Sequence, residues 1–432
     1  MKMQGNYDFL RFRELLKFVF ENKYSDFYRR KYEQVSFNPL SDFKSIEDIK
    51  KIPFLTRKEL AITDPKKLLF IEEDGVDCII PTSGTTGDPF FVFHSFAIPN
   101  LPTHHDSLNF GKILSLVNPL RIKPNHYFIP YEFKIKNNQL LPGDIYNIPA
   151  SLKIASKIKV NTIYTTTPSL AIILKDYLDQ NPELKNSLKF LILGGELVSP
   201  YKKIFLQELY PNLEIFINYG AAEFPGTLGD QCTFLAQRND RVYYHPLFSI
   251  AHLEIIDPLT EKNVEIGKEG ELVVTCFHNR ATPLIRYKTG DLVRFHKNDC
   301  PCGCPGPLLE VLGRAKFDIV KVGGFGLRRE MLEKAILNLK DYLKESFEAH
   351  FYENFIGTKP RTKMILNLSL KKWVKETPEL KRKIERELLE NWQLSPRLNL
   401  KMAVEADLFE IPQINFVQFP PLAKARQAFI LH

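Results

Sequence analysis

Apolar runs of strand length alternate with helical stretches between residues 150 and 220. The strand-like runs NTIYTTTP, LKFLILGGE and LEIFINYGAAE are separated by the helical stretches SLAIILKDYL and YKKIFLQELY. Strands that are apolar throughout are typical of parallel sheets covered by helices on both faces. The pattern therefore predicts an α/β fold with a mostly parallel sheet, whose ligands bind at the carboxyl ends of the strands.

The pattern changes again further along the chain. From about residue 230, β-type segments such as AHLEIID, GELVVTCF and LVRFHK follow one another with Gly, Asp and Pro between them, which predicts a smaller β-rich subdomain. Beyond LLEVLGR the chain becomes an α+β mixture. A single domain is improbable at 432 residues. We therefore predict a domain boundary near Gly313.

Composition excludes several classes of protein. The net charge of +8, from 59 basic and 51 acidic residues spread along the chain, does not indicate nucleic-acid binding. Apolar runs stay below the ~18 residues that span a bilayer, and the charged N-terminus is not a signal peptide. We expect a cytoplasmic protein without membrane insertion. In a reducing compartment the crowded thiols Cys300, Cys302 and Cys304 are more often metal ligands than disulfides.

The stretch PTSGTTGDPFF at residues 81–91 lies between two apolar runs. Backbone N–H groups and hydroxyls of such a Gly/Thr/Ser loop can form a nest for phosphate oxygens. A plain turn is the alternative. The loop is not the P-loop of nucleoside triphosphatases, because Gly84 and Gly87 are three apart and no Lys follows.

Four further motifs follow the loop in order along the chain. They are NYGAAE at 218–223, YKTGDL at 287–292, GRAKFD at 313–318 and PPLAKAR at 420–426. With the loop, they resemble the adenylate-forming superfamily of acyl-CoA synthetases, luciferases and peptide-synthetase adenylation domains. Within it the chain is most similar to phenylacetate-CoA ligases and coenzyme F390 synthetase, through the opening helix FRELLKFVFENKYSDFYRR and a loop that lacks Lys.

The resemblance implies a nucleotide site assembled from these motifs. Tyr219 would stack against adenine, Glu223 would hold Mg²⁺, and Lys424 would neutralise charge as a carboxylate attacks the α-phosphate. Glu223, Lys424 and Thr86 are the implied catalytic residues. The implied nucleotide-binding residues are Thr82, Ser83, Gly84, Thr85, Thr86 and Gly87 for the β- and γ-phosphates, Tyr219, Gly220, Ala221, Ala222 and Glu223, and Asp291 and Arg314 for the ribose.

The resemblance also implies the reaction and the domains. A carboxylic acid and ATP would form an acyl-adenylate and pyrophosphate, and a thiol, coenzyme A or a carrier-protein arm, would then displace AMP. A nucleotidyl transferase that attaches AMP to an acceptor, like coenzyme F390 synthetase, is the alternative. Residues 1–312 would form the large N-terminal domain of stacked α/β and β-rich subdomains. A hinge at 313–317 with Lys316 would connect it to a small mobile α+β domain at 318–432.

A zinc site is also implied by the resemblance, since many members of this group carry a CPCG motif and some also have an upstream Cys and His. Cys232, His245, Cys300 and Cys302 match this pattern and would form a closed Cys₃His site of structural type. Two alternatives to this site remain open. Cys304 could replace one of the ligands, or the three neighbouring cysteines could be reduced surface thiols on a loop. The acid is not indicated, because residues 126–150 depart from the phenylacetate enzymes. A homodimer is possible.

Overall fold

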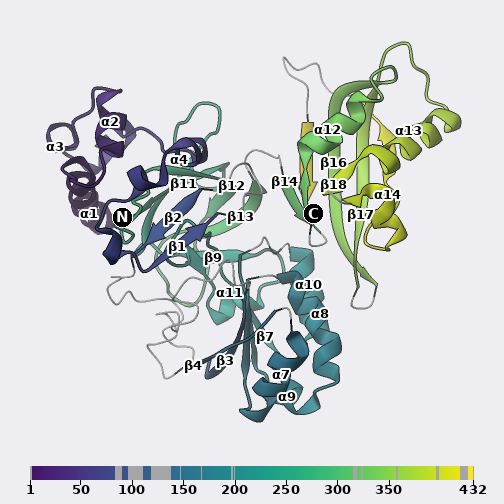
Figure 1. Cartoon of the computed structure of the whole chain (residues 1–432), viewed down its shortest axis with the longest axis horizontal. Coiled ribbons are helices and arrows are strands. Elements are labelled where there is room, and N and C mark those ends of the chain that lie inside the picture. Colours follow the sequence, from purple (N-terminus) through teal and green to yellow (C-terminus); the bar gives the residue numbers. More distant parts are fainter. Residues whose placement is uncertain are drawn as a thin grey trace.

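The computed structural model describes residues 2–82, 90–95, 110–117, 138–145, 147–166, 168–195, 198, 200–314, 319–322, 325–356, 359–395, 398–418 and 427–431. Within these residues the chain has the mixed α/β fold that the sequence predicts (Figure 1). A parallel sheet, a larger antiparallel sheet and a C-terminal α+β unit follow one another along the sequence.

The N-terminal part consists of one long helix and several short ones, and residues of most of them join the core of the antiparallel sheet. They are α1 (Lys2–Phe20), α2 (Phe27–Glu33), α3 (Pro39–Asp42), η1 (Ile46–Lys51), α4 (Arg57–Ile62), η2 (Pro65–Leu68) and η3 (Glu73–Gly75). Thr56 caps α4, since its hydroxyl accepts from the Glu59 N–H and its own N–H donates to the Glu59 carboxylate. The hairpin β1 (Cys78–Pro81) and β2 (Phe91–His94) follows, with Pro81 paired to Phe91.

The central part contains the predicted parallel sheet, in the strand order β4-β3-β5-β6-β7. Its strands are β3 (Lys112–Leu116), β4 (Gln139–Pro142), β5 (Thr162–Thr165), β6 (Phe190–Leu193) and β7 (Glu214–Ile217), with helices α7 (Ile148–Lys157), α8 (Pro168–Asp179), α9 (Pro182–Ser187) and α10 (Pro200–Leu209). Leu191 and Leu193 face the main core, whereas Ile192 between them joins a second cluster with Ala236. Both faces of the sheet are therefore covered, which explains its apolar strands.

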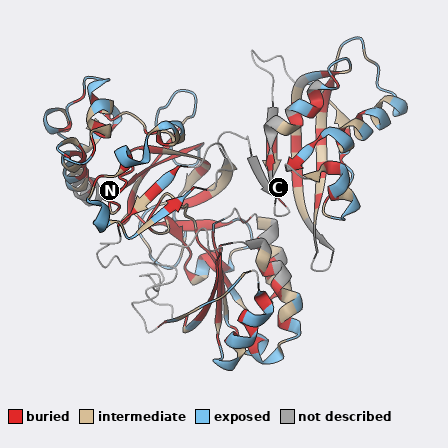
Figure 2. Cartoon of the chain, viewed as in Figure 1, coloured by how far each residue is buried: buried red, intermediate tan, exposed pale blue. Residues whose placement is uncertain are grey.

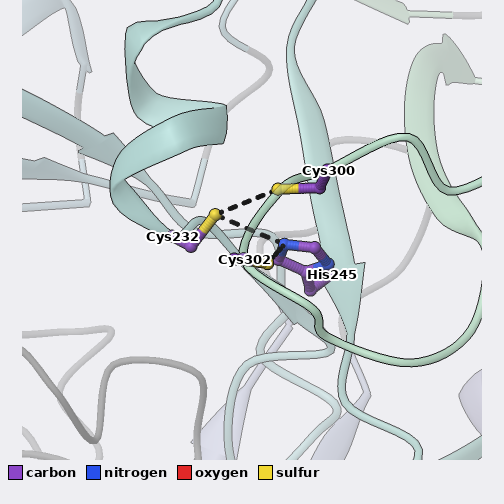
Figure 3. A group of neighbouring side chains, drawn as sticks. All are labelled: Cys232, His245, Cys300 and Cys302. Atoms are coloured by element: carbon purple, nitrogen blue, oxygen red, sulfur yellow. Dashed lines mark hydrogen bonds between the residues drawn. The ribbon is translucent and has the colours of Figure 1, made fainter.

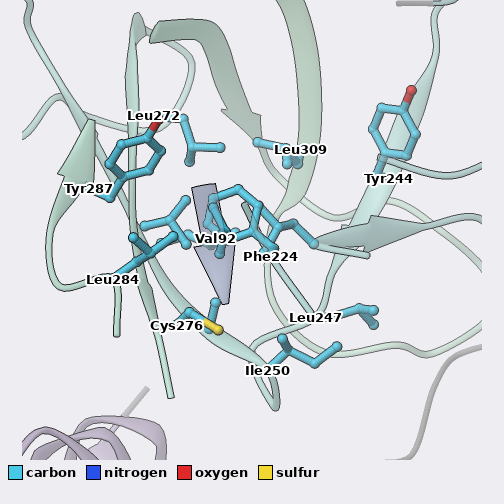
Figure 4. Packing of buried hydrophobic residues seen from close by; sticks show 14 of the residues in the cluster. Val92, Phe224, Tyr244, Leu247, Ile250, Leu272, Cys276, Leu284, Tyr287 and Leu309 are labelled. Carbon is cyan, nitrogen blue, oxygen red and sulfur yellow. The ribbon is translucent and has the colours of Figure 1, made fainter. Parts of the chain in front are cut away.

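The β-rich part forms a six-stranded antiparallel sheet in the order β10-β11-β12-β13-β9-β8. Its elements are β8 (Gly229–Asp230), α11 (Thr233–Gln237), β9 (Tyr243–Pro246), β10 (Ala251–Ile256), β11 (Glu269–Cys276), β12 (Tyr287–His296) and β13 (Leu308–Arg314). Figure 4 shows apolar side chains of this sheet packed with Val92 of β2 and with Phe224. The loop-bearing hairpin and the antiparallel sheet thus share one core.

The C-terminal part forms a four-stranded sheet in the order β20-β17-β16-β21 with its own helices. Its elements are β14 (Ile319–Val322), β15 (Phe325–Arg328), α12 (Arg329–Leu337), β16 (Leu343–Ile356), β17 (Lys359–Leu370), α13 (Pro378–Asn391), β18 (Gln393–Ser395), β19 (Leu398–Asn399), α14 (Leu400–Glu405), β20 (Gln413–Phe416) and β21 (Gln427–Leu431). The fully buried Trp392 packs against the rings of Phe351 and Phe429 in this core.

Two large cores are separate in sequence. One contains residues from Phe12 to Leu309, and the other contains residues from Val322 to Phe429. Figure 2 shows the buried residues concentrated in the strands of each part. Among the described residues, no helix is long and apolar enough to cross a membrane.

Candidate active site and cysteine–histidine cluster

The motif at residues 218–223 begins where β7 ends, at the carboxyl edge of the parallel sheet. The N–H of Tyr219 donates to the Gly229 carbonyl at 2.8 Å, and the Leu228 N–H donates to the Tyr219 carbonyl at 2.7 Å. A Cβ added at Gly220 would lie 3.3 Å from the Thr227 Cα, so this close approach favours glycine. These contacts tie the motif to β8 and join the parallel sheet to the antiparallel one.

Tyr219 meets Asp291 at the junction of the two sheets. The Tyr219 hydroxyl donates to the Asp291 carboxylate at 2.7 Å, and its ring lies 5.9 Å from that of Tyr244. Asp291 lies in β12 directly opposite Arg314 of β13 in the strand register. Asp291 and Arg314 are therefore neighbours in the sheet. The side chain of Tyr219 reaches Asp291 although the two residues are 72 positions apart in sequence.

Glu223 lies at the end of the same motif and is largely buried. Its carboxylate accepts a hydrogen bond from the Tyr287 hydroxyl at 3.3 Å and lies 3.5 Å from the Arg57 guanidinium. The next residue, Phe224, is buried in the core beside Val92 and Tyr287 (Figure 4). This packing fixes the backbone from which Glu223 projects, and its two oxygens provide the hard ligands that a magnesium ion prefers.

Thr82 closes the base of the Gly/Thr loop. Its N–H donates to the Phe90 carbonyl at 2.9 Å, and its hydroxyl accepts from the Phe90 N–H at 3.1 Å. The Arg57 guanidinium donates to the same hydroxyl at 3.1 Å. Thr82 is 4% exposed. It therefore has a structural role at the start of the segment 83–89, and it is also part of the predicted phosphate loop.

Sequence reasoning missed Arg57 and Tyr287 as members of this site. Arg57 is the first residue of α4, which lies outside all of the sequence motifs. Tyr287 is the first residue of the YKTGDL motif, but its contact with Glu223 depends on how β12 packs near residues 218–223 in the folded chain. Neither contact has a local sequence signature.

Several predicted site residues lie outside the described residues. These are Ser83, Gly84, Thr85, Thr86, Gly87, Lys316 and Lys424, while Arg314 is described by its backbone alone. Their roles stay predictions. Among the described site residues, Thr82, Tyr219, Glu223 and Asp291 make the contacts given above. Gly220, Ala221 and Ala222 lie between Tyr219 and Glu223 in the chain.

The four predicted zinc ligands come together in one cluster (Figure 3). The Sγ atoms of Cys232 and Cys300 are 3.4 Å apart, and the His245 Nε2 lies 3.4 Å from the Cys232 Sγ and 3.2 Å from the Cys302 Sγ. All four ligand atoms lie within 4.8 Å of one another. Zinc–sulfur bonds of about 2.3 Å at tetrahedral angles place sulfurs about 3.8 Å apart, so the donor set fits a tetrahedral metal.

The cluster is formed by three separated segments. Cys232 precedes α11, His245 belongs to β9, and Cys300 and Cys302 lie between β12 and β13. Burial raises the pKa of the Cys232 thiol, and it raises the pKa of the Cys300 thiol to about 12. Without a metal these thiols are therefore protonated at neutral pH. The Cys304 N–H donates to the Cys302 Sγ at 3.4 Å, an outer contact of the kind that orients metal ligands.

Sequence relatives and solved structures agree with the fold described above. A phenylacetate-coenzyme A ligase of Pseudomonas putida is 24% identical over 368 residues, covering 80% of this chain and 77% of that ligase. The phenylacetate-coenzyme A ligase of Thermus thermophilus is 24% identical over 355 residues, covering 77% and 74%. A 2-hydroxyisobutyryl-CoA ligase, solved with 2-HIB-AMP and CoA, has a TM-score of 0.66 at 19% identity, covering 100% of this chain and 90% of its own. No protein-family model matches the chain.

The chain shares its fold with the 2-hydroxyisobutyryl-CoA ligase and is similar in sequence to the two phenylacetate-CoA ligases. Both similarities support the resemblance to the adenylate-forming superfamily that the order of its motifs indicates.

Proposed function

We propose that this chain is an AMP-forming acid–thiol ligase. A carboxylate oxygen of the acid attacks the α-phosphorus of ATP, which gives an acyl-adenylate and releases pyrophosphate. The thiol of coenzyme A then attacks the acyl carbon, and AMP leaves. The observation that carries this proposal is the convergence of the loop base, residues 218–223 and β12 through the side chains of Thr82, Glu223 and Asp291.

The proposed nucleotide contacts are those that the resemblance of the motifs implies. The Asp291 carboxylate accepts hydrogen bonds from the ribose hydroxyls, and the Arg314 guanidinium donates to them. The ring of Tyr219 stacks on adenine. Gly220, Ala221 and Ala222 lie along the nucleotide. Residues 82–87 donate to the β- and γ-phosphates, with Thr86 as the hydroxyl that contributes to catalysis. Glu223 would hold Mg²⁺, which would neutralise phosphate charge during adenylyl transfer.

Lys424 is the cation that approaches the α-phosphate during the first half reaction. It belongs to the C-terminal unit, so its approach depends on how residues 318–432 sit on residues 1–312. The separation of the two cores between Leu309 and Val322 supports a hinge at 313–317 that includes Lys316. Rotation about such a hinge would let one site serve both half reactions.

Zn²⁺ is proposed as a structural ion bound by Cys232, His245, Cys300 and Cys302. The set of four donors leaves no open position for catalysis. Because Cys300 and Cys302 connect β12 to β13, the ion would stabilise the strands that carry Asp291 and Arg314. Coenzyme A is favoured as the acceptor because the relatives described above are named as coenzyme A ligases.

Acid-dependent exchange of labelled pyrophosphate into ATP tests the first half reaction. The acids should span aryl, fatty, hydroxy and amino acids, with and without coenzyme A. The proposal expects exchange with at least one acid, and AMP release that requires coenzyme A for multiple turnovers. Exchange that needs no acid but an alcohol or phosphate acceptor would indicate a nucleotidyl transferase instead. No exchange with any acid would overturn the ligase proposal.

A further inference from the structure

Arg57 lies between the loop base and the carboxylate of Glu223. One guanidinium nitrogen donates to the Thr82 hydroxyl at 3.1 Å, and the other lies 3.5 Å from the Glu223 carboxylate. The guanidinium carbon lies 5.1 Å from the centroid of the Phe90 ring. Because Thr82 and Phe90 are the residues on either side of the segment 83–89, Arg57 touches both ends of the predicted phosphate loop.

Backbone hydrogen bonds hold Arg57 in this place. The Leu55 N–H donates to the Arg286 carbonyl at 3.0 Å, and the Lys288 N–H donates to the Leu55 carbonyl at 2.9 Å. The capping box of Thr56 and Glu59 then sets the first turn of α4, in which Arg57 is the first residue. The segment is thus fixed to the start of β12, which also supplies the Tyr287 hydroxyl to Glu223.

The loop itself supplies no positive charge. Residues 81–91 read PTSGTTGDPFF and contain Asp88 but neither Lys nor Arg. A triphosphate with its strong negative charge needs cations as well as N–H donors, and a guanidinium forms paired, charge-assisted hydrogen bonds with phosphate oxygens. The Arg57 side chain is 22% exposed, so part of it is open to solvent.

We propose that Arg57 is the cation of the polyphosphate subsite and that Glu223 holds its guanidinium in place in the nucleotide-free enzyme. This inference rests on the proposed nucleotide site. In the complex with ATP, Glu223 would hold Mg²⁺, and the Arg57 guanidinium would donate to the β- or γ-phosphate instead of pairing with Glu223. Arg57 therefore contributes to the binding of ATP and pyrophosphate, whereas AMP lacks the groups that it contacts.

Calorimetric titration of the full chain with ATP plus Mg²⁺ and, separately, with AMP tests this role. The Arg57→Gln variant is expected to bind ATP about 10- to 100-fold more weakly, the range for a lost hydrogen bond to a charged group, and AMP within about twofold of wild type. Arg57→Lys keeps the charge without the fork, so it is expected to lose about threefold or more for ATP alone.

Lys31→Gln is the matched control. Lys31 lies on α2 and forms an ion pair with Glu59, which lies on the same short helix as Arg57. This substitution removes a cation beside α4 without touching Thr82 or Glu223, so both affinities should stay at the wild-type values. If Lys31→Gln weakens ATP as much as Arg57→Gln does, the effect belongs to the helix and the inference fails. Circular dichroism checks that each variant is folded.

The results separate the inference from the function beneath it. Wild-type protein that binds neither ATP nor AMP overturns both. Wild-type protein that binds both nucleotides, together with an unchanged ratio of the ATP and AMP dissociation constants in Arg57→Gln, overturns the role of Arg57 alone. Should Arg57→Gln not fold, the same ratio in Arg57→Lys decides the question.

Discussion

Replacing Glu254 by Gln should strongly destabilise the N-terminal part of the chain. Glu254 and Arg286 form a buried ion pair, with two hydrogen bonds of 3.0 and 2.9 Å and side chains that are 4% and 5% exposed. Arg286 also donates to the Ile52 carbonyl at 2.6 Å and lies over the Phe54 ring at 4.0 Å. Gln keeps the volume of Glu but removes its charge and turns one acceptor into a donor that faces the guanidinium.

The expected loss follows from the burial of the pair. Removing one partner of a buried ion pair leaves an uncompensated charge and costs about 3–5 kcal/mol, a large fraction of the ~5–15 kcal/mol by which a domain is stable. With a urea m-value of about 3 kcal/mol/M, this loss lowers the unfolding midpoint by about 1–1.7 M. Asp179→Asn is the control, because the largely solvated ion pairs of Asp179 with Lys175 and Lys185 contribute less than ~1 kcal/mol each.

The two tryptophans allow the two parts of the chain to be monitored separately. Both Trp373 and Trp392 belong to the C-terminal unit, and Trp392 is fully buried in its core. Tryptophan emission during urea unfolding therefore reports on the C-terminal unit, while far-ultraviolet circular dichroism reports on the whole chain. Urea is used because a salt denaturant would screen the ion pair.

Glu254→Gln should shift the main dichroism transition and leave the tryptophan transition close to its wild-type midpoint. The reasoning about the buried pair is refuted if the dichroism midpoint moves no further than it does in Asp179→Asn. A tryptophan transition that moves together with the dichroism would show that the two cores unfold as one unit, contrary to the proposed boundary at residues 313–317.

Three further outcomes are expected from the proposed sites. Elemental analysis should find about one zinc per chain, lost in Cys300→Ser but retained in Cys304→Ser; zinc-free, folded wild-type protein would remove the metal proposal. Lys424→Ala should slow pyrophosphate exchange by about 100-fold or more and leave thiol attack on a supplied acyl-adenylate much less affected, and equal losses in both halves would contradict its assigned role. Asp291→Asn should weaken AMP binding about tenfold or more by calorimetry, and Tyr219→Phe should weaken it less because the stacking ring is kept; the opposite order would contradict these roles.

The parallel sheet was predictable because its signal is local. Each of β5, β6 and β7 is a short strand-like run flanked by helical periodicity, and both faces of these strands are buried in the structure. The order of the motifs added the superfamily and hence the arrangement of the β-rich and C-terminal parts. Periodicity alone would not have joined Tyr219 to Asp291, since their contact depends on how two sheets meet.

The cysteine–histidine cluster shows a second limit of local reasoning. The close spacing of Cys300 and Cys302 indicates metal ligands by itself, but Cys232 and His245 were predicted from the resemblance. In the structure, His245 of β9 pairs with Asp230 of β8, which lies two residues before Cys232. Strand β9 also pairs with β13, which follows the segment that contains Cys300 and Cys302. Strand pairing of this long range brings the four ligands together, and the sequence between them does not encode it locally.

Arg286 connects the buried ion pair to the candidate active site. Its φ of +50° is unusual for a residue other than glycine and costs of the order of 1–2 kcal/mol. The side chain of Arg286 enters the buried pair with Glu254, while the next residue, Tyr287, donates to Glu223. The ion pair and the Ile52 carbonyl offset the strain and hold the residues 52–57 that lead to Arg57. A change at Glu254 should therefore weaken ATP binding even in the protein that remains folded, because the backbone that positions Arg57 and Tyr287 depends on that pair.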